Sequence, residues 1–203
     1  MAKGSATAGI VVGLLLAAGR STRFGSNKLC HLLPGEVPIA VRSAQHLQAG
    51  VGNVLAVVRA DDSVLAGYLR AAGIESVVCA EAGEGMAATI VCGVAASKDA
   101  GGWVIALADM PYIEPRTIAA VRVAVAHGEL LAAPYFHGRR GHPVGFGACL
   151  ADELLSLSGD EGARRVIAKH ATRLHRIDRE DAGVLADIDV PADLQRSFEP
   201  DDR

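Results

Sequence analysis

Basic residues and glycines gather in one short stretch near the N-terminus, residues 16–28, with the sequence LAAGRSTRFGSNK. Gly19 and Gly25 allow backbone N–H groups to approach an anion closely. Arg23 can form paired hydrogen bonds with phosphate oxygens, and Lys28 supplies a mobile positive charge. The stretch therefore has the chemistry of a phosphate-binding loop.

An acidic residue stands in a comparable place later in the chain. Asp109 directly follows the apolar residues 103–108, and Pro111 prevents that segment from continuing as a strand. A carboxylate is an oxygen ligand of the kind that Mg²⁺ takes beside a substrate phosphate. A phosphate-binding loop, a lysine and a carboxylate together predict phosphoryl or nucleotidyl transfer.

The loop lacks two familiar nucleotide-binding motifs. Neither G-x-x-x-x-G-K-[ST] nor G-x-G-x-x-G can be read through Gly19, Gly25 and Lys28. A P-loop protein is therefore excluded, and an NAD-dependent oxidoreductase loses its main support.

The elements that must position these residues alternate between apolar strands and amphipathic helices. Residues 54–58 and 104–108 are apolar without alternation, which is typical of strands buried on both faces of a parallel sheet. The β-α-β-α order predicts a single-domain α/β fold, an open, mostly parallel twisted sheet with helices on both faces. Ligands of such sheets bind beyond the carboxyl ends of the strands, so we expect the loop and Asp109 at one edge.

The expected elements follow from hydrophobic pattern, caps and glycine stops. From Pro134 onward the rhythm is less regular, and we expect a glycine-rich stretch there. The predicted strands are residues 10–17, 53–58, 74–79, 103–108, 130–133 and 173–177; the predicted helices are residues 38–48 (with Gly50 just past the end), 61–72, 86–97 and 115–127, with two short ones around Asp152 and at 162–170.

Composition limits the class of protein. The 203 residues are 50% hydrophobic, which suits one domain over residues 1–203, with flexible ends at 1–9 and 199–203. The formal net charge of -3 excludes a general nucleic-acid binder.

No apolar run approaches the ~20 residues of a membrane span. The apolar residues 10–18 imitate a short secretory signal, but the regular rhythm that follows favours a strand. Four scattered cysteines without a C-x-x-C pair indicate a reduced, cytoplasmic setting, and we expect the cysteines and Met86 in the core.

The chain resembles the small nucleotidyltransferases that act on molybdenum cofactor. Residues 16–28 resemble their L-A-A-G-x-S-x-R-x-G-x-x-K signature, and L-A-A-G is the form typical of the cytidylyltransferases, where guanylyltransferases usually carry L-A-G-G. The chain departs from the pattern at Phe24, Thr89 and Val190 and in its longer residues 34–39. Five further segments match in order: GEGMAATI (83–90), LADMP (107–111), GRRGHPVGF (138–146), GDEGARRVI (159–167) and DIDVPAD (187–193).

The resemblance implies a Rossmann-like nucleotidyltransferase that joins CTP to molybdopterin with Mg²⁺ as cofactor and releases pyrophosphate. It implies that Arg23 and Lys28 contact the phosphates and that Asp109 and Asp189 hold the metal. A molybdoenzyme or chaperone is a possible transient partner, and neither nucleic acid nor membrane is expected. The implied substrate-binding residues are Leu16, Ala17, Ala18, Gly19, Arg20, Ser21 and Gly25 of the loop, Gly85 and Thr89 beside the cytosine, and His142 with the Gly159–Gly162 turn beside the pterin.

Other interpretations stay open at this point. GTP could be the donor, or a sugar or polyol phosphate the acceptor, and a non-catalytic cofactor carrier could share the fold. Asp109 could instead cap a turn, Asp189 could cap a helix that begins at Pro191, and His142 could be a buried turn histidine. Arg164 and Arg165 have the pattern of solvated helix residues.

Overall fold

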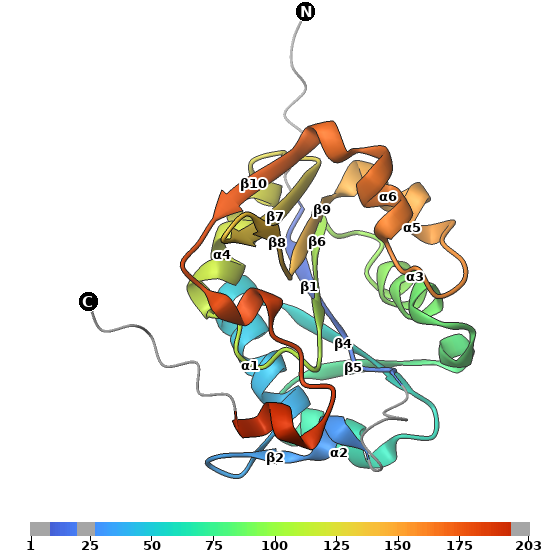
Figure 1. The fold of residues 1–203 in the computed structure, drawn as a ribbon. Coiled ribbons are helices and arrows are strands. Elements are labelled where there is room, and N and C mark those ends of the chain that lie inside the picture. The colour runs from blue at the N-terminus through green and yellow to red at the C-terminus, as the bar shows by residue number, and fades with distance from the viewer. Residues whose placement is uncertain (1–8, 20–26, 196–203) are drawn as a thin grey trace, which may run out of the picture.

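The computed structural model describes residues 9–19 and 27–195, and an eight-stranded sheet runs through its centre (Figure 1). The strand order is β10-β7-β9-β6-β1-β4-β5, with β8 paired to β7. A separate two-stranded sheet joins β2 to β3. The strands are β1 (Val11–Leu16), β2 (Leu32–Leu33), β3 (Val37–Pro38), β4 (Val54–Arg59), β5 (Glu75–Cys79), β6 (Gly102–Leu107), β7 (Leu131–Phe136), β8 (Arg139–Arg140), β9 (Val144–Gly147) and β10 (Leu174–Asp178).

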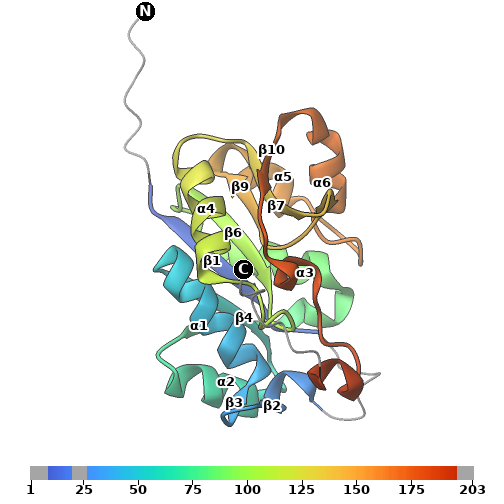
Figure 2. The same ribbon diagram turned by 60° about the vertical axis from the view of Figure 1, so that its left-hand side comes forward.

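Helices cover both faces of the sheet (Figures 1 and 2). One face packs on α1, α2 and α4, and the other on α3, α5 and α6. Neighbouring strand residues point to opposite faces, so Leu15 lies in the first core and Leu14 in the second. The helices are α1 (Ile39–Val51), α2 (Ser63–Ala71), α3 (Met86–Ala96), α4 (Pro115–Ala126), α5 (Ala151–Leu155) and α6 (Arg164–Lys169), and short 3-10 helices occupy Lys28–Cys30, Ala80–Glu84, Ala148–Leu150, Ala171–Arg173, Ala182–Leu185 and Pro191–Gln195.

The parallel pairing of β1 with β6 places the two predicted site segments at the same edge. Leu16 pairs with Leu107 at the last position of both strands. The ladder continues one step further, where the Ala108 amide donates to the Leu16 carbonyl at 3.2 Å. The loop after β1 and the turn containing Asp109 therefore leave the sheet side by side, as the sequence predicts.

The fold departs from the sequence prediction beyond residue 130. β7 continues through Pro134 to Phe136, and the expected irregular stretch contains β8 and β9. β9 runs antiparallel between β6 and β7, with Val144 opposite Ile105 and Phe146 opposite Trp103. The prediction was wrong here because a four-residue strand with two glycines has no readable alternation.

The end of the first long helix also differs. Gly50 lies inside α1, and the helix ends at Gly52, which has a φ of 95°. A Cβ on Gly50 would lie 2.6 Å from Ile118 Cγ2 in α4. Gly50 therefore serves the close packing of α1 on α4 rather than the helix stop.

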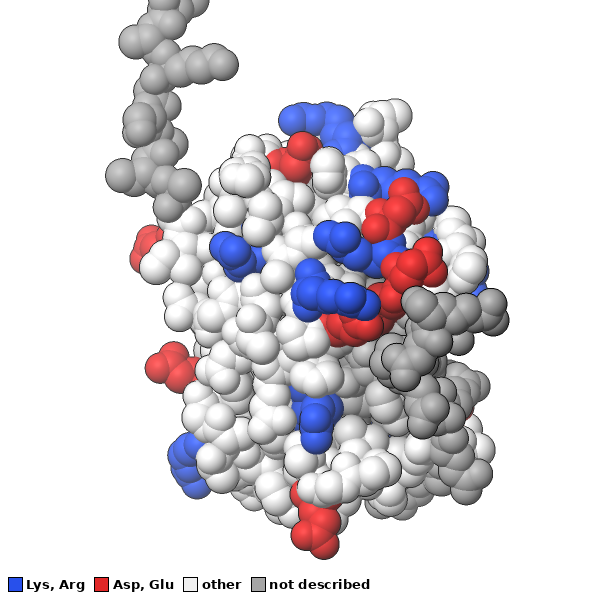
Figure 3. Space-filling view, turned by 90° about the vertical axis from the view of Figure 1, so that its left-hand side faces the viewer, with Lys and Arg blue, Asp and Glu red and all other residues white. Residues whose placement is uncertain are grey.

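The surface that carries β10 and α4 mixes positive and negative side chains (Figure 3). Arg176 pairs with Asp178 in β10 at 2.6 Å, and Arg116 pairs with Glu114 at the start of α4. This face therefore lacks the single-sign surface that binds nucleic acid. Within residues 9–19 and 27–195, no helix has both the length and the hydropathy to cross a bilayer.

Candidate active site

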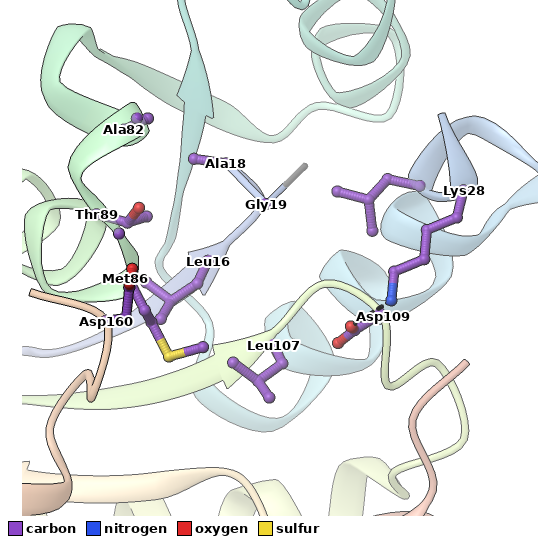
Figure 4. A pocket seen from close by; sticks show the side chains of 13 residues that line it. Leu16, Ala18, Gly19, Lys28, Ala82, Met86, Thr89, Leu107, Asp109 and Asp160 are labelled. Carbon is purple, nitrogen blue, oxygen red and sulfur yellow. Dashed lines mark hydrogen bonds and ion pairs between the residues drawn. The ribbon is translucent and has the colours of Figure 1, made fainter. Parts of the chain in front are cut away.

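A cleft of about 580 Å³ opens at the carboxyl ends of β1 and β6. Leu16 and Leu107, the last residues of those strands, line it together with Ala18 and Gly19. Figure 4 shows Lys28 and Asp109 on one side of this cleft, and Ala82, Met86, Thr89 and Asp160 on the opposite side. The cleft thus has a charged wall and a wall formed mainly by the start of α3.

Lys28 joins three distant parts of the chain on the charged wall. Its Nζ donates to Asp109 Oδ2 at 2.9 Å and to Asp189 Oδ1 at 2.9 Å. The Lys28 side chain is 12% exposed, whereas those of Asp109 and Asp189 are 24% and 45% exposed. The ammonium is therefore held inside the wall by two partly exposed carboxylates, of which Asp109 lines the cleft.

Each member of this triad is positioned by local backbone structure. Lys28 is the first residue of a 3-10 helix, and Asp109 lies two residues after the end of β6. The Asp109 carbonyl accepts from the Ile188 amide at 2.9 Å, which ties the C-terminal segment to the β6 turn. Asp193 Oδ2 accepts from the amides of Asp189 and Val190, both at 2.9 Å, and so holds the turn that aims Asp189.

The electrostatics of the triad keep Lys28 charged. Partial burial lowers the pKa of the Lys28 ammonium, but the hydrogen bonds and charges of Asp109 and then Asp189 outweigh burial, and the pKa lies above its ordinary value of 10.5. At neutral pH the wall therefore holds one positive charge between two carboxylates.

The carboxylates of Asp109 and Asp189 fit a hard divalent cation. Both reach one point, and the Lys28 ammonium already stands at that point as a positive ion. In the part of the chain that the structure describes, no group of three or more His, Cys, Asp or Glu side chains could hold a metal. Mg²⁺ commonly binds through one or two carboxylates and completes its shell with water and phosphate oxygens. The donor set thus suits a cation that a phosphate chain helps to hold.

The opposite wall is built where α3 begins. Gly85 precedes the helix with φ 113° and ψ -176°, a conformation that is essentially restricted to glycine. A Cβ at this position would lie 2.1 Å from Asp160 Oδ1. The Ala87 amide donates to the Gly159 carbonyl at 3.2 Å, and Thr89, buried on the first turns, faces the cleft. The Gly159–Asp160 turn therefore rests directly on the start of α3.

A second cavity of about 240 Å³ adjoins the cleft. It shares Leu16, Met86, Leu107 and Asp160 with the cleft, so the two spaces lie side by side. Hydrophobic side chains from β6, β9, α3 and α6 form much of its lining, and polar groups come from Arg140, His142, Asp160, Glu161 and Arg164. This cavity therefore offers a second group both apolar contacts and charged side chains of either sign.

His142 lies at this second cavity as a neutral side chain. Burial lowers its pKa, the charge of Arg140 adds to the effect, and the result is about 4. Its Nδ1 atom is buried without a hydrogen-bond partner among the described residues. His142 therefore carries no charge at neutral pH.

The structure brings together most of the predicted site residues that it describes. Asp189 adjoins the cleft through Lys28, His142 lies at the second cavity, and the Ala17 side chain packs in the core instead of facing the cleft. Arg20, Ser21, Arg23 and Gly25 lie outside the described residues. Those lining the cleft are Leu16, Ala18, Gly19, Lys28, Gly85, Thr89 and Asp109.

Sequence reasoning missed several residues of the site. Met86 was expected in the core but is 45% exposed and lines both spaces, and Cys149 is exposed rather than buried. Arg164 is exposed as expected, but it also lines the second cavity with Arg140. Asp160 belongs to the Gly159–Gly162 turn that the resemblance places beside the pterin, and it lines both spaces.

The arrangement belongs to a known family. A model of the MobA-like NTP transferase domain matches residues 13–174, and the chain belongs to this family of nucleotidyltransferases. The chain is 33% identical to the purine catabolism protein PucB of Bacillus subtilis (strain 168) over 192 residues, covering 89% of this chain and 92% of PucB. It is 28% identical to nicotine blue oxidoreductase of Paenarthrobacter nicotinovorans over 195 residues, which cover 92% of this chain and 95% of that protein.

The fold recurs in solved structures. Rv0371c from Mycobacterium tuberculosis H37Rv superimposes with a TM-score of 0.78 at 26% identity, covering 93% of this chain and 96% of Rv0371c. Another structure of Rv0371c, with a TM-score of 0.72, is a complex with manganese. The mostly parallel sheet with helices on both faces is therefore the fold of this group of proteins.

Proposed function

We propose that the protein transfers CMP from CTP to the terminal phosphate of molybdopterin. An oxygen of the acceptor phosphate attacks the α-phosphorus of CTP, the new P–O bond forms, and the bond to the β-phosphate breaks to release pyrophosphate. The observation that supports this proposal best is the meeting of Lys28, Asp109 and Asp189 at the strand ends beside Gly19. The choice of CTP and molybdopterin rests on the sequence motifs.

The charged wall would handle the phosphates. Both reactants are anions, so the protein must neutralise charge and align the reacting groups. The Lys28 ammonium would contact the α-phosphoryl group, where negative charge grows during transfer. Phosphate contacts of Arg23 and the Gly25 backbone stay predictions, because these residues lie outside the described part of the chain.

Asp109 and Asp189 would hold the divalent cation. When bound, Mg²⁺ would neutralise phosphate charge and orient the phosphate chain. The carboxylates supply two oxygen ligands from separate segments, after β6 and before the last 3-10 helix.

The remaining walls would hold the two organic groups. Thr89 and the backbone around Gly85 would lie against the base, on the wall opposite Lys28. The adjoining cavity would take the acceptor, with the Arg140 and Arg164 guanidinium groups facing its negative charge and His142 as a neutral neighbour. Because the two spaces share part of their lining, an acceptor in the second cavity would place its phosphate near the α-phosphorus. We place the reaction in the cytoplasm, with a molybdoenzyme or its chaperone as the receiver of the product.

The test is a donor screen with molybdopterin as acceptor. CTP, GTP, ATP and UTP are each incubated with protein, Mg²⁺ and acceptor, and pyrophosphate and the dinucleotide product are measured. We expect turnover with CTP and little with the other three. Turnover with GTP alone would overturn the cytidylyl assignment. If none of the four nucleoside triphosphates leads to pyrophosphate release, the result would favour a non-catalytic carrier.

A further inference from the structure

The Lys28 ammonium occupies the position between Asp109 and Asp189 that a divalent metal ion would take in the proposed function. Its Nζ lies 2.9 Å from one oxygen of Asp109 and 2.9 Å from one oxygen of Asp189, and its side chain is only 12% exposed. A lysine on a solvated loop would keep its ammonium in water. Here the ammonium points inward and donates hydrogen bonds to the two carboxylates that the proposed function assigns to the metal.

A divalent cation would have to use the same carboxylates. In the described part of the chain these acids have no third acidic, histidine or cysteine side chain to complete a metal site. A cation arriving alone would gain only two carboxylates in exchange for water and would meet the positive charge of Lys28 at close range. The protein by itself is therefore a poor host for the metal.

A nucleoside triphosphate changes this balance. Its phosphate chain offers Lys28 a new set of negatively charged acceptors, and lysine has a flexible stem that can follow them. The same chain brings oxygen ligands for the cation. Binding of the nucleotide thus removes the competing ammonium and completes the metal's shell in one event.

We propose that Lys28 is a resident counter-cation, which reserves the Asp109–Asp189 site for a divalent cation that arrives as its complex with a nucleoside triphosphate. This inference rests on the proposed function, because it concerns the metal carboxylates of that site. It adds a second task to Lys28, in the resting protein rather than during transfer. By linkage, metal and nucleotide must raise each other's affinity by the same factor.

The experiment measures Mn²⁺ binding to the protein without nucleotide. Mn²⁺ takes oxygen ligands as Mg²⁺ does, and electron paramagnetic resonance distinguishes free from bound ion. We compare wild type with Lys28→Met, which removes the charge and leaves an apolar side chain, and with Lys28→Gln, which removes the charge but keeps a polar group. Lys98→Met, at an exposed lysine after α3, is the matched control for net charge. We expect the Lys28 variants to bind Mn²⁺ about tenfold more tightly than wild type and the control.

A second measurement uses wild type alone and therefore holds even if both Lys28 variants fail to fold. Affinity for a non-hydrolysable CTP analogue is measured with and without Mn²⁺, and we expect a large gain with the metal. Equal Mn²⁺ affinity of wild type and the Lys28 variants would overturn the inference while leaving the proposed function intact. Tight Mn²⁺ binding by wild type without nucleotide would also overturn the inference and leave the proposed function intact. Absence of Mn²⁺ binding with or without the analogue would overturn both.

Discussion

At the scale of single residues, the meeting of Lys28 with Asp109 could be predicted from the sequence. Lys28 closes a glycine-rich loop after one strand, and Asp109 follows another, so parallel strands were enough to predict their meeting. The contact of Lys28 with Asp189 was beyond such reasoning, because 161 residues separate them and no paired strand carries Asp189 to the site. Only the family motif indicated a role for Asp189.

Replacing Lys28 tests the main catalytic assignment. Lys28→Ala should lower the rate of nucleotidyl transfer by ~10²–10³, because one well-placed charge contact in the transition state commonly contributes this much. The rate constant at saturating CTP and Mg²⁺ is the measurement, with circular dichroism to show that the fold is kept. Lys98→Ala is the control and should retain full activity. A folded Lys28→Ala protein with wild-type turnover would remove Lys28 from the chemistry.

His142 gives the protein a specific sensitivity to acid. The unfolded chain takes up a proton at this ring near pH 6.5, whereas the folded protein does so only near its pKa of about 4. The unfolded state therefore binds more protons between these values, and stability falls as the pH drops through 6.5. At pH 5 the loss is about 2 kcal/mol.

Urea unfolding at pH 7 and pH 5 measures this loss. In His142→Gln the loss of stability between the two pH values should be smaller by about 2 kcal/mol than in wild type. Other groups titrate equally in both proteins, so the difference belongs to His142. An identical pH dependence of the two proteins would show that the ring is not protected from protonation.

At the scale of elements, the parallel half of the sheet was predictable and the antiparallel insertion was not. β1, β4 and β6 are buried on both faces and are therefore continuous apolar runs. β9 pairs with β6 and β7 across long sequence separations, and its residues Gly145 and Gly147 give no pattern. Its position depends on close packing, since a Cβ on Gly145 would lie 2.5 Å from Val125 Cγ2.

The junction between α3 and the Gly159–Asp160 turn makes a prediction at this scale. Gly85→Ala should destabilise the fold by about 1–3 kcal/mol from backbone strain alone. A further loss should come from the contact with Asp160 Oδ1, 2.1 Å from the new Cβ. The free energy of unfolding in urea is the measurement, together with the affinity for CTP, which should fall.

Gly128→Ala and an Asp160→Ala background separate the two causes. Gly128 also has a positive φ, 94°, but no atom lies within 4 Å of a Cβ placed there. Gly128→Ala should therefore lower the free energy of unfolding through backbone strain alone, without a steric clash. In Asp160→Ala protein, Gly85→Ala should cost less than in wild type. Equal costs in both backgrounds would mean that the Gly85–Asp160 contact is not formed in solution.

At the scale of the whole molecule, the sheet gathers the site from nearly the full length of the chain. Lys28, Asp109 and Asp189 meet at one wall, and the start of α3 and the Gly159–Asp160 turn form the other. A nucleotide bound in this cleft would bridge these segments. Composition and element order predicted the architecture, but not that the C-terminal segment returns to the charged wall.

Because a bound nucleotide would contact segments from most of the chain, we expect the substrate to stabilise the entire fold. CTP with Mg²⁺ at about 100 times its Kd should add about 2.7 kcal/mol to the stability, and the melting temperature should rise accordingly. Thermal unfolding with each of the four nucleoside triphosphates is the measurement. Asp189→Ala should reduce the rise caused by CTP and Mg²⁺. A rise that is equal for wild type and Asp189→Ala would exclude Asp189 from the bound state.

The family match ends at residue 174, yet Asp189 and the Asp193 turn that aims it lie beyond that limit. A gene fusion or an excised fragment designed on the recognised segment would therefore lose β10 and one of the two acids that neutralise Lys28. Such a product would keep Lys28 and Asp109 but lack Asp189, so a single carboxylate would hold the ammonium and the charged wall would have one negative charge fewer. Engineering of this protein should therefore preserve the chain through at least residue 195.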